Sequence, residues 1–202
     1  MTANAHSLIA ELDVAIGHAS TSRQSQILQR ITDLFLSDTM SFSEEQIAIF
    51  DDVIQRLIEK AENPALVKLS TRLAPVGNAP PNTIATLAQS DDAAVATPVL
   101  ALSPVVTDAV IAKVIVSSKG PKHLAAVAGR GRMSEEVTDA LIERGNPDVL
   151  LKAAANPNAR FSEMGFVKMI SRAKTDKTLA AVIAARADVP EELAPFVKLA
   201  LG

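Results

Sequence analysis

The sequence predicts an all-α protein, a helical-repeat solenoid preceded by an N-terminal helical bundle or cap. Three observations predict it: apolar residues at helical spacing in residues 1–75, a 28-residue period in the later part of the chain, and a composition rich in small side chains. Apolar residues make up 48% of the 202 residues but aromatic ones only 3%, which favours closely packed helices. Because one short helix pair cannot bury its own apolar face, a fixed period of this size indicates stacked pairs.

Four helices are expected in the first 75 residues. The stretch from Ser7 to Ile16 has apolar residues at helical spacing, and "STS" at 20–22 supplies an N-cap for a second helix. Ser43 and Gln46 fit a capping box that begins a third helix, which Asn63-Pro64 ends before a short fourth. The apolar stripes of the second and third helices comprise Ile27, Leu28, Ile31, Leu34 and Phe35, and Ile47, Phe50, Ile54, Leu57 and Ile58.

The stretch "PVGNAPP" (75–81) is the best candidate for a domain boundary, because it holds three prolines and a glycine. It divides the chain into an N-terminal bundle or cap, 1–75, and a repeat array, 76–202. The expected units lie near 82–120, 121–146, 147–175 and 176–202. In the first and most divergent unit, Asp91-Asp92 occupy a turn, where a helix cap is the favoured interpretation.

Equivalent residues of the later units lie 28 positions apart. The matched sets are Met133, Phe161 and Val189; Ser134, Ser162 and Pro190; Glu135, Glu163 and Glu191; and Leu141, Met169 and Val197. Each unit therefore consists of a short helix, a turn and a second helix. The serines are expected as N-caps, Pro190 in a first turn, and the glutamates near the positive helix end.

These repeated stretches resemble a known family. "DDAAVATPVLALSPVVTDAVI", "HLAAVAGRGRMSEEVTDALIERG", "NPNARFSEMGF" and "RADVPEELAPFV", in that order, are similar to an uncharacterised bacterial family catalogued as a domain of unknown function. The resemblance covers nearly the whole chain. It implies a HEAT-like or leucine-rich-variant helical-repeat fold and no established activity.

The composition excludes several classes of function. Without cysteine there is no disulfide, thiolate nucleophile or Cys-type zinc site, and His6, His18 and His123 are scattered, so we expect no metal, cofactor or catalytic residues. No secretory leader or bilayer-spanning run is evident, so we expect a cytoplasmic protein that does not use a membrane. The net charge of −3 argues against a general nucleic-acid binder, although 113–177 holds twelve bases and seven acids.

Candidate binding residues are the arginines of the repeats. Arg132 and Arg160 share a repeat position, Arg130 and Arg186 share another where the middle unit has Asn158, and Lys168 and Arg172 are weaker candidates. One interpretation is that each arginine pairs with the nearby Glu135, Glu163 or Glu191 and braces its turn. The other is an arginine ladder along one edge that contacts phosphates or carboxylates of a partner.

The expected function is that of a non-enzymatic scaffold or adaptor, because helical arrays expose extended surfaces and no catalytic constellation stands out. Its partner is expected to be another macromolecule, most readily a protein. The alternative is a regulatory module that binds a phosphate-bearing ligand, a nucleotide second messenger or nucleic acid, through the arginine ladder. Self-association through the N-terminal helices is a third possibility.

Overall fold

A computed structural model of the chain describes residues 20–39, 41–117 and 119–202. These residues form twelve α-helices and one short 3₁₀ helix, with a single isolated β-bridge and no β-strand, which confirms the all-α prediction. The helix expected from Ser7 to Ile16 lies outside the described residues. The chain folds into two compact units, Met1–Val99 with Ser103–Val106, and Leu100–Leu102 with Thr107–Gly202. The boundary expected at 75–81 falls within the first unit, and the division into 1–75 and 76–202 stays a prediction.

The first unit is built from α2 (Thr21–Ser37), α3 (Glu44–Ile58), α4 (Asn63–Leu73), α5 (Pro81–Ala88) and most of α6 (Ala93–Leu102). Its packing joins α2 to α3 and α4, and α5 to α3 and α4. The predicted N-cap Ser20 and the capping box of Ser43 with Gln46 are both present, and Asp92 caps α6 by accepting from the amide of Ala94.

One expected core residue of the first unit is misplaced in the sequence interpretation. Helix α2 buries the face that carries Leu28 and Phe35, but Leu34 is 56% exposed. Neighbouring residues of an α-helix point about 100° apart. Leu34 therefore projects away from the face on which Phe35 packs.

A buried carboxylate of α3 begins helix α5. The N-cap position of α5 is Pro80, which supplies no capping side chain. The carboxylate of Asp51 takes that role, since it accepts from the amide of Asn82 at 2.8 Å and from the amide and hydroxyl of Thr83 at 2.7 Å. A negative charge at the positive end of a helix dipole is favourable. Asp51, only 2% exposed, thus joins two helices that are distant in sequence.

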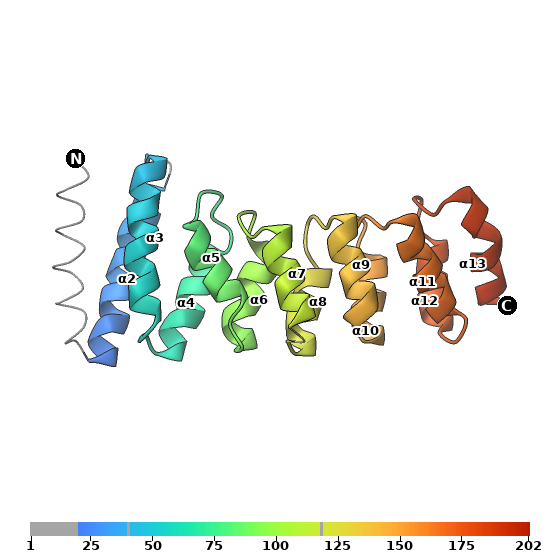
Figure 1. The fold of residues 1–202 in the computed structure, drawn as a ribbon, viewed down its shortest axis with the longest axis horizontal. Coiled ribbons are helices and arrows are strands. Elements are labelled where there is room, and N and C mark those ends of the chain that lie inside the picture. The colour runs from blue at the N-terminus through green and yellow to red at the C-terminus, as the bar shows by residue number, and fades with distance from the viewer. Residues whose placement is uncertain (1–19, 40, 118) are drawn as a thin grey trace. The chain divides into compact units, whose positions relative to one another are not determined.

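The second unit consists of antiparallel helix pairs in two layers. One layer holds α7 (Asp108–Val116), α9 (Glu135–Arg144), α11 (Glu163–Ala173) and α13 (Ala194–Leu201), and the other holds α8 (Pro121–Ala128), α10 (Pro147–Ala155) and α12 (Lys177–Ala184). Within a layer each helix contacts the next one, and across the layers α7 contacts α8, α8 contacts α9, α9 contacts α10, α11 contacts α12 and α12 contacts α13. In Figure 1 the turns that follow α8, α10 and α12 lie along the upper edge of this unit.

The 28-residue period is visible in the second unit as a repeated helix start. Helices α9 and α11 begin at Glu135 and Glu163, and a 3₁₀ turn, η1 (Glu191–Leu193), begins 28 residues further on and leads into α13. Ser134 and Ser162 are N-caps as predicted, while Pro190 stands just before the 3₁₀ turn rather than inside a first turn. The matched residues Leu141, Met169 and Val197 are all buried.

We expect Asp51→Asn to lower the free energy of unfolding by about 2 kcal/mol, because hydrogen bonds to a buried charged acceptor are worth about 1.5 to 3 kcal/mol. The neighbouring Asp52 is exposed, so Asp52→Asn is a matched control that should change stability by less than about 0.5 kcal/mol. Urea unfolding followed by circular dichroism measures both. Equal midpoints for the two variants would contradict the capping role of Asp51.

Candidate functional site

The turns that follow α8, α10 and α12 form what we call the turn edge, residues 129–134, 156–162 and 185–190. Two of these turns are joined by backbone hydrogen bonds in an isolated parallel bridge between Met133 and Ala159. The amide of Met133 donates to the carbonyl of Asn158 at 3.3 Å, and the amide of Arg160 donates to the carbonyl of Met133 at 3.2 Å. This bridge fixes the backbone on which the candidate arginines stand.

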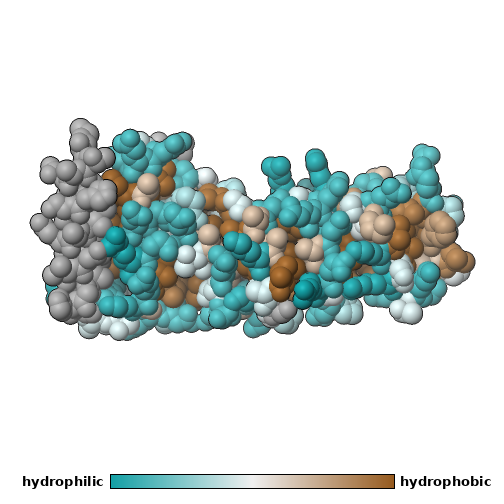
Figure 2. Space-filling view, viewed as in Figure 1, coloured by the Kyte–Doolittle hydropathy of each residue, from teal (hydrophilic) through white to brown (hydrophobic). Residues whose placement is uncertain are grey.

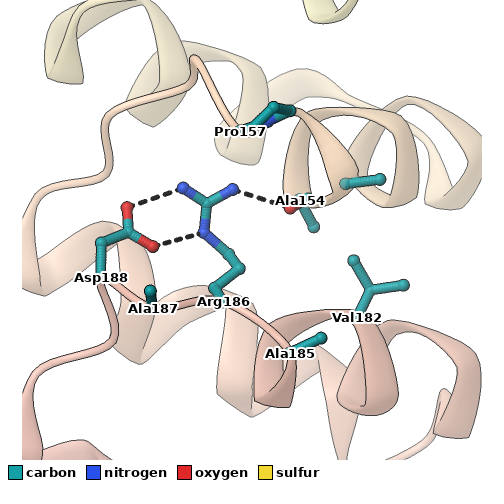
Figure 3. A pocket seen from close by; sticks show the side chains of 8 residues that line it. Ala154, Pro157, Val182, Ala185, Arg186, Ala187 and Asp188 are labelled. Carbon is teal, nitrogen blue, oxygen red and sulfur yellow. Dashed lines mark hydrogen bonds and ion pairs between the residues drawn. The ribbon is translucent and has the colours of Figure 1, made fainter.

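The guanidinium of Arg186 is held entirely inside the turn edge. Nε and Nη2 donate to the two carboxylate oxygens of Asp188 at 2.7 Å, as Figure 3 shows. Nη1 donates to the carbonyls of Ala154 and Asn156 at 2.8 and 2.9 Å, and Nη2 also donates to that of Ala159 at 2.9 Å. An arginine has five N–H donors, and all five are used.

The surroundings of Arg186 add to this arrangement. Its side chain is only 8% exposed, and its guanidinium carbon lies 4.7 Å from the ring centroid of Phe161, a cation–π contact. A pocket of about 570 Å³ lies beside it. Figure 3 shows Ala154, Pro157 and Val182 among its lining residues. Arg186 therefore braces the turn, through Asp188 and backbone carbonyls rather than through Glu191.

Arg130 and Asn156 also bind backbone carbonyls of the preceding helix pair. Nη1 of Arg130 donates to the carbonyl of Leu100, and the side-chain amide of Asn156 donates to the carbonyls of Ala128 and Arg130 at 3.0 and 2.8 Å. Burial lowers the pKa of the Arg130 guanidinium, and nearby Asp108 opposes this effect. Each of Arg130, Asn156 and Arg186 thus binds carbonyls at the C-terminal end of the first helix of the preceding helix pair. We call these three residues the carbonyl clamp.

The middle member of the carbonyl clamp is Asn156, not Asn158 as the 28-residue spacing suggested. The turn after α10 runs over 156–162, whereas those after α8 and α12 run over 129–134 and 185–190, so it is one residue longer. Sequence reasoning missed Asn156 because it matched residues at a fixed spacing and did not allow the turn to change length. Counting from the end of each first helix would have placed Asn156 close to Arg130 and Arg186.

The remaining pair, Arg132 and Arg160, is exposed and lines one groove. We call this the turn groove; its volume is about 790 Å³. Among the described residues neither arginine side chain makes an ion pair or hydrogen bond. The charged and polar residues that line the turn groove are Arg132, Arg160, Asp108, Ser134, Glu135, Glu136, Asn158 and Asp188. The structure therefore brings Arg132 and Arg160 together and separates them from the buried Arg130 and Arg186.

The two weaker candidates lie along the contact between α9 and α11. Lys168 forms an ion pair with Glu143, and its hydrogen bond and charge lower the pKa of that carboxyl group. Arg172 donates to the carbonyl of Gly145 at 3.3 Å, which places it at the C-terminal end of α9. Neither lines the turn groove.

The histidines supply no further site. His123 is buried in α8, and His6 and His18 lie outside the described residues. Across 20–39, 41–117 and 119–202, no three or more His, Cys, Asp or Glu side chains are grouped to hold a metal ion. In the same ranges no helix has both the length and the apolar character needed to cross a membrane.

Comparison with known families identifies the chain. Residues 95–195 match the model of the family described as "Uncharacterised protein conserved in bacteria (DUF2336)", which is half of the sequence. The chain belongs to this family. The match to DUF2336 takes in the turn edge, both arginines of the turn groove and the carbonyl clamp. Searches of curated proteins and of solved structures gave no match.

We expect Arg186→Lys to lower the free energy of unfolding by about 3 kcal/mol. A lysine is a point charge with three donors and cannot reproduce a planar fork that binds one carboxylate and three carbonyls. Arg160→Lys, on an exposed residue, is the matched control and should change stability by less than about 0.5 kcal/mol. Guanidinium unfolding measures both, and an unaltered midpoint for Arg186→Lys would show that the carbonyl clamp does not stabilise the unit.

Proposed function

We propose that this chain is a non-enzymatic adaptor whose turn groove binds a segment of another protein. The observation that carries the proposal is that Arg132 and Arg160 line the same groove. Both are exposed, and neither forms an ion pair among the described residues. Helical pairs stacked as a repeat array present surfaces of this kind to partners. We extend the proposal to a HEAT-like solenoid arrangement of the repeats.

The charge of the turn groove favours a polypeptide partner. Two arginines share the groove with the carboxylates of Asp108, Glu135 and Glu136. Glu135 and Glu136 form no ion pair among the described residues, and Asp108 lies near Arg130. A polypeptide segment can offer carboxylates to the arginines and basic side chains to the acids. A phosphate group offers only negative charge, which the surrounding carboxylates repel.

The backbone beneath the groove is fixed before any partner arrives. The amide of Arg160 donates to Met133, its carbonyl accepts from the hydroxyl of Thr138, and its neighbour Ala159 is held by Arg186. Ordering on binding therefore falls to exposed side chains such as Arg132 and Arg160 rather than to the backbone. A pre-organised backbone lowers the entropic cost of association, which each immobilised side chain raises by about 0.5 to 1.5 kcal/mol.

The phosphate-binding alternative has less support at this edge. Arg130 and Arg186 use their guanidinium groups on backbone carbonyls, so two of the four arginines of the predicted ladder hold the fold together. The remaining Arg132 and Arg160 lie among carboxylates. Of the predicted arginine ladder, only Arg132 and Arg160 are therefore proposed to contact a partner. A protein segment is the partner that we favour.

A photo-crosslinking amino acid at the exposed Asn158, in the turn groove, tests the proposal. We expect it to form a covalent adduct with a protein in a bacterial extract, identifiable by mass spectrometry. Arg132→Glu with Arg160→Glu should reduce the adduct at least about tenfold, since reversing two interface charges costs more than about 1.4 kcal/mol.

Two controls sharpen this experiment. The same crosslinker at exposed Thr175, in the turn between α11 and α12, should not capture the same protein. Arg144→Glu with Lys174→Glu reverses two charges away from the groove and should leave the adduct at Asn158 unchanged. Lack of an adduct, or equal adducts from the wild type and the Arg132/Arg160 variant, would overturn the proposal.

A further inference from the structure

The second unit has another edge, opposite the turn edge, where α7, α9, α11 and α13 end and α8, α10 and α12 begin. In Figure 1 its connections lie along the lower side of the unit. Two interactions confirm that these ends meet: Arg172 donates to the carbonyl of Gly145, and Nζ of Lys177 donates to the carbonyls of Ala200 and Leu201 at 3.0 and 2.8 Å. We call it the basic edge because cationic side chains gather along it.

Cationic side chains gather along the basic edge. Those in or next to the first or last helical turns there that form neither an ion pair nor a side-chain hydrogen bond among the described residues are Lys113, Lys122, Arg144, Lys174 and Lys198. All five are exposed, and Figure 2 shows a largely hydrophilic lower margin over this unit. They come from successive units, so the charges follow one another along the edge.

Few carboxylates oppose these charges. Glu143, in the last turn of α9, is already paired with Lys168. The other acids in the turns at this edge are Asp176, which caps α12 by accepting from the amide of Leu179 at 3.0 Å, and Asp148. By contrast, the first turns at the turn edge carry six acids: Asp108, Glu135, Glu136, Glu163, Glu191 and Glu192.

A hollow of about 340 Å³ lies on the basic edge, with Lys119 and Arg144 on its rim and the apolar Ile115 and Leu124 among its lining residues. Helices α8, α10 and α12 begin on this side and α7, α9, α11 and α13 end there, so positive and negative dipole ends alternate along the edge and largely offset each other. Helix stability does not account for Lys122, because a cation in a first turn is disfavoured by the dipole. The exposed cations and the hollow beside Arg144 are therefore the features that favour anions at this edge.

We propose that the basic edge binds the phosphate backbone of a single-stranded nucleic acid without regard to its base sequence. A linear polyanion matches cations that follow one another across successive units. With no Trp or Tyr in the chain, the stacking platform that usually accompanies single-strand binding is lacking, so the contacts fall on phosphates. The net charge of −3 is compatible with this, because the acids gather at the opposite edge.

Fluorescence anisotropy with labelled, mixed-sequence single-stranded DNA and RNA, over a series of salt concentrations, tests this inference on the full chain. Four or five phosphate contacts predict a plot of log K against log salt with a slope of about −3, since each contact contributes about −0.7 on single strands. Lys122→Gln, Arg144→Gln and Lys174→Gln together should weaken binding at least about tenfold and make the slope shallower by about 2. Wild-type affinity and slope in this variant would overturn the inference.

Three comparisons distinguish binding at the basic edge from binding at the turn edge, from damage to the fold and from binding to lipid. Arg132→Gln with Arg160→Gln, at the turn edge, should bind the oligonucleotides like the wild type, and equal losses in both variants would overturn the assignment. Lys122→Arg with Lys174→Arg keeps the charges and should keep binding, which controls for damage to the fold. Binding to phosphatidylserine vesicles but not to oligonucleotides would reassign the edge to a lipid surface, where the exposed Leu199 would take part, and would overturn the nucleic-acid proposal.

Discussion

The carbonyl clamp is the interaction on which the second unit depends. The last carbonyls of an α-helix have no partner inside the helix, and burying them unpaired is costly. Here Arg130, Asn156 and Arg186 satisfy such carbonyls at Leu100, Ala128 and Ala154, each in the preceding helix pair. Because the donor and the helix end that it completes belong to different helix pairs, no helix pair is fully bonded without its neighbour.

The first unit solves the complementary problem with the opposite charge. Helix α5 begins at a proline and has no capping side chain of its own, so the carboxylate of Asp51 reaches its first amides from α3. Carboxylates suit the positive end of a helix, and guanidinium groups suit the negative end. In both units a charge buried between helices completes a helix end, and it thereby fixes which helices pack together.

The limits of the sequence interpretation follow from the range of each interaction. Helix starts at Glu135 and Glu163 are encoded locally, by a serine N-cap followed by acids, and they were predicted correctly. The roles of Arg186 and Asn156 were not, because their acceptors lie about 30 residues away and are backbone atoms that any sequence would offer. Asn156 also lies two residues before the position that the spacing gives, because the turn after α10 begins one residue early and Asn156 is its first residue, whereas Arg130 and Arg186 are the second residues of their turns. Which arginines are buried is likewise a property of packing.

Helix dipoles account for much of the charge pattern and thereby single out the residues whose placement has a different cause. Acids in the first turns of α9 and α11, and bases in the last turns of these helices, stabilise them regardless of any partner. Arg132 and Arg160 lie just before the positive ends of the same helices, where a cation is unfavourable, and no carboxylate among the described residues compensates them. Neither the helix dipole nor an ion pair accounts for this placement, and that is the physical basis of the binding proposed at the turn groove.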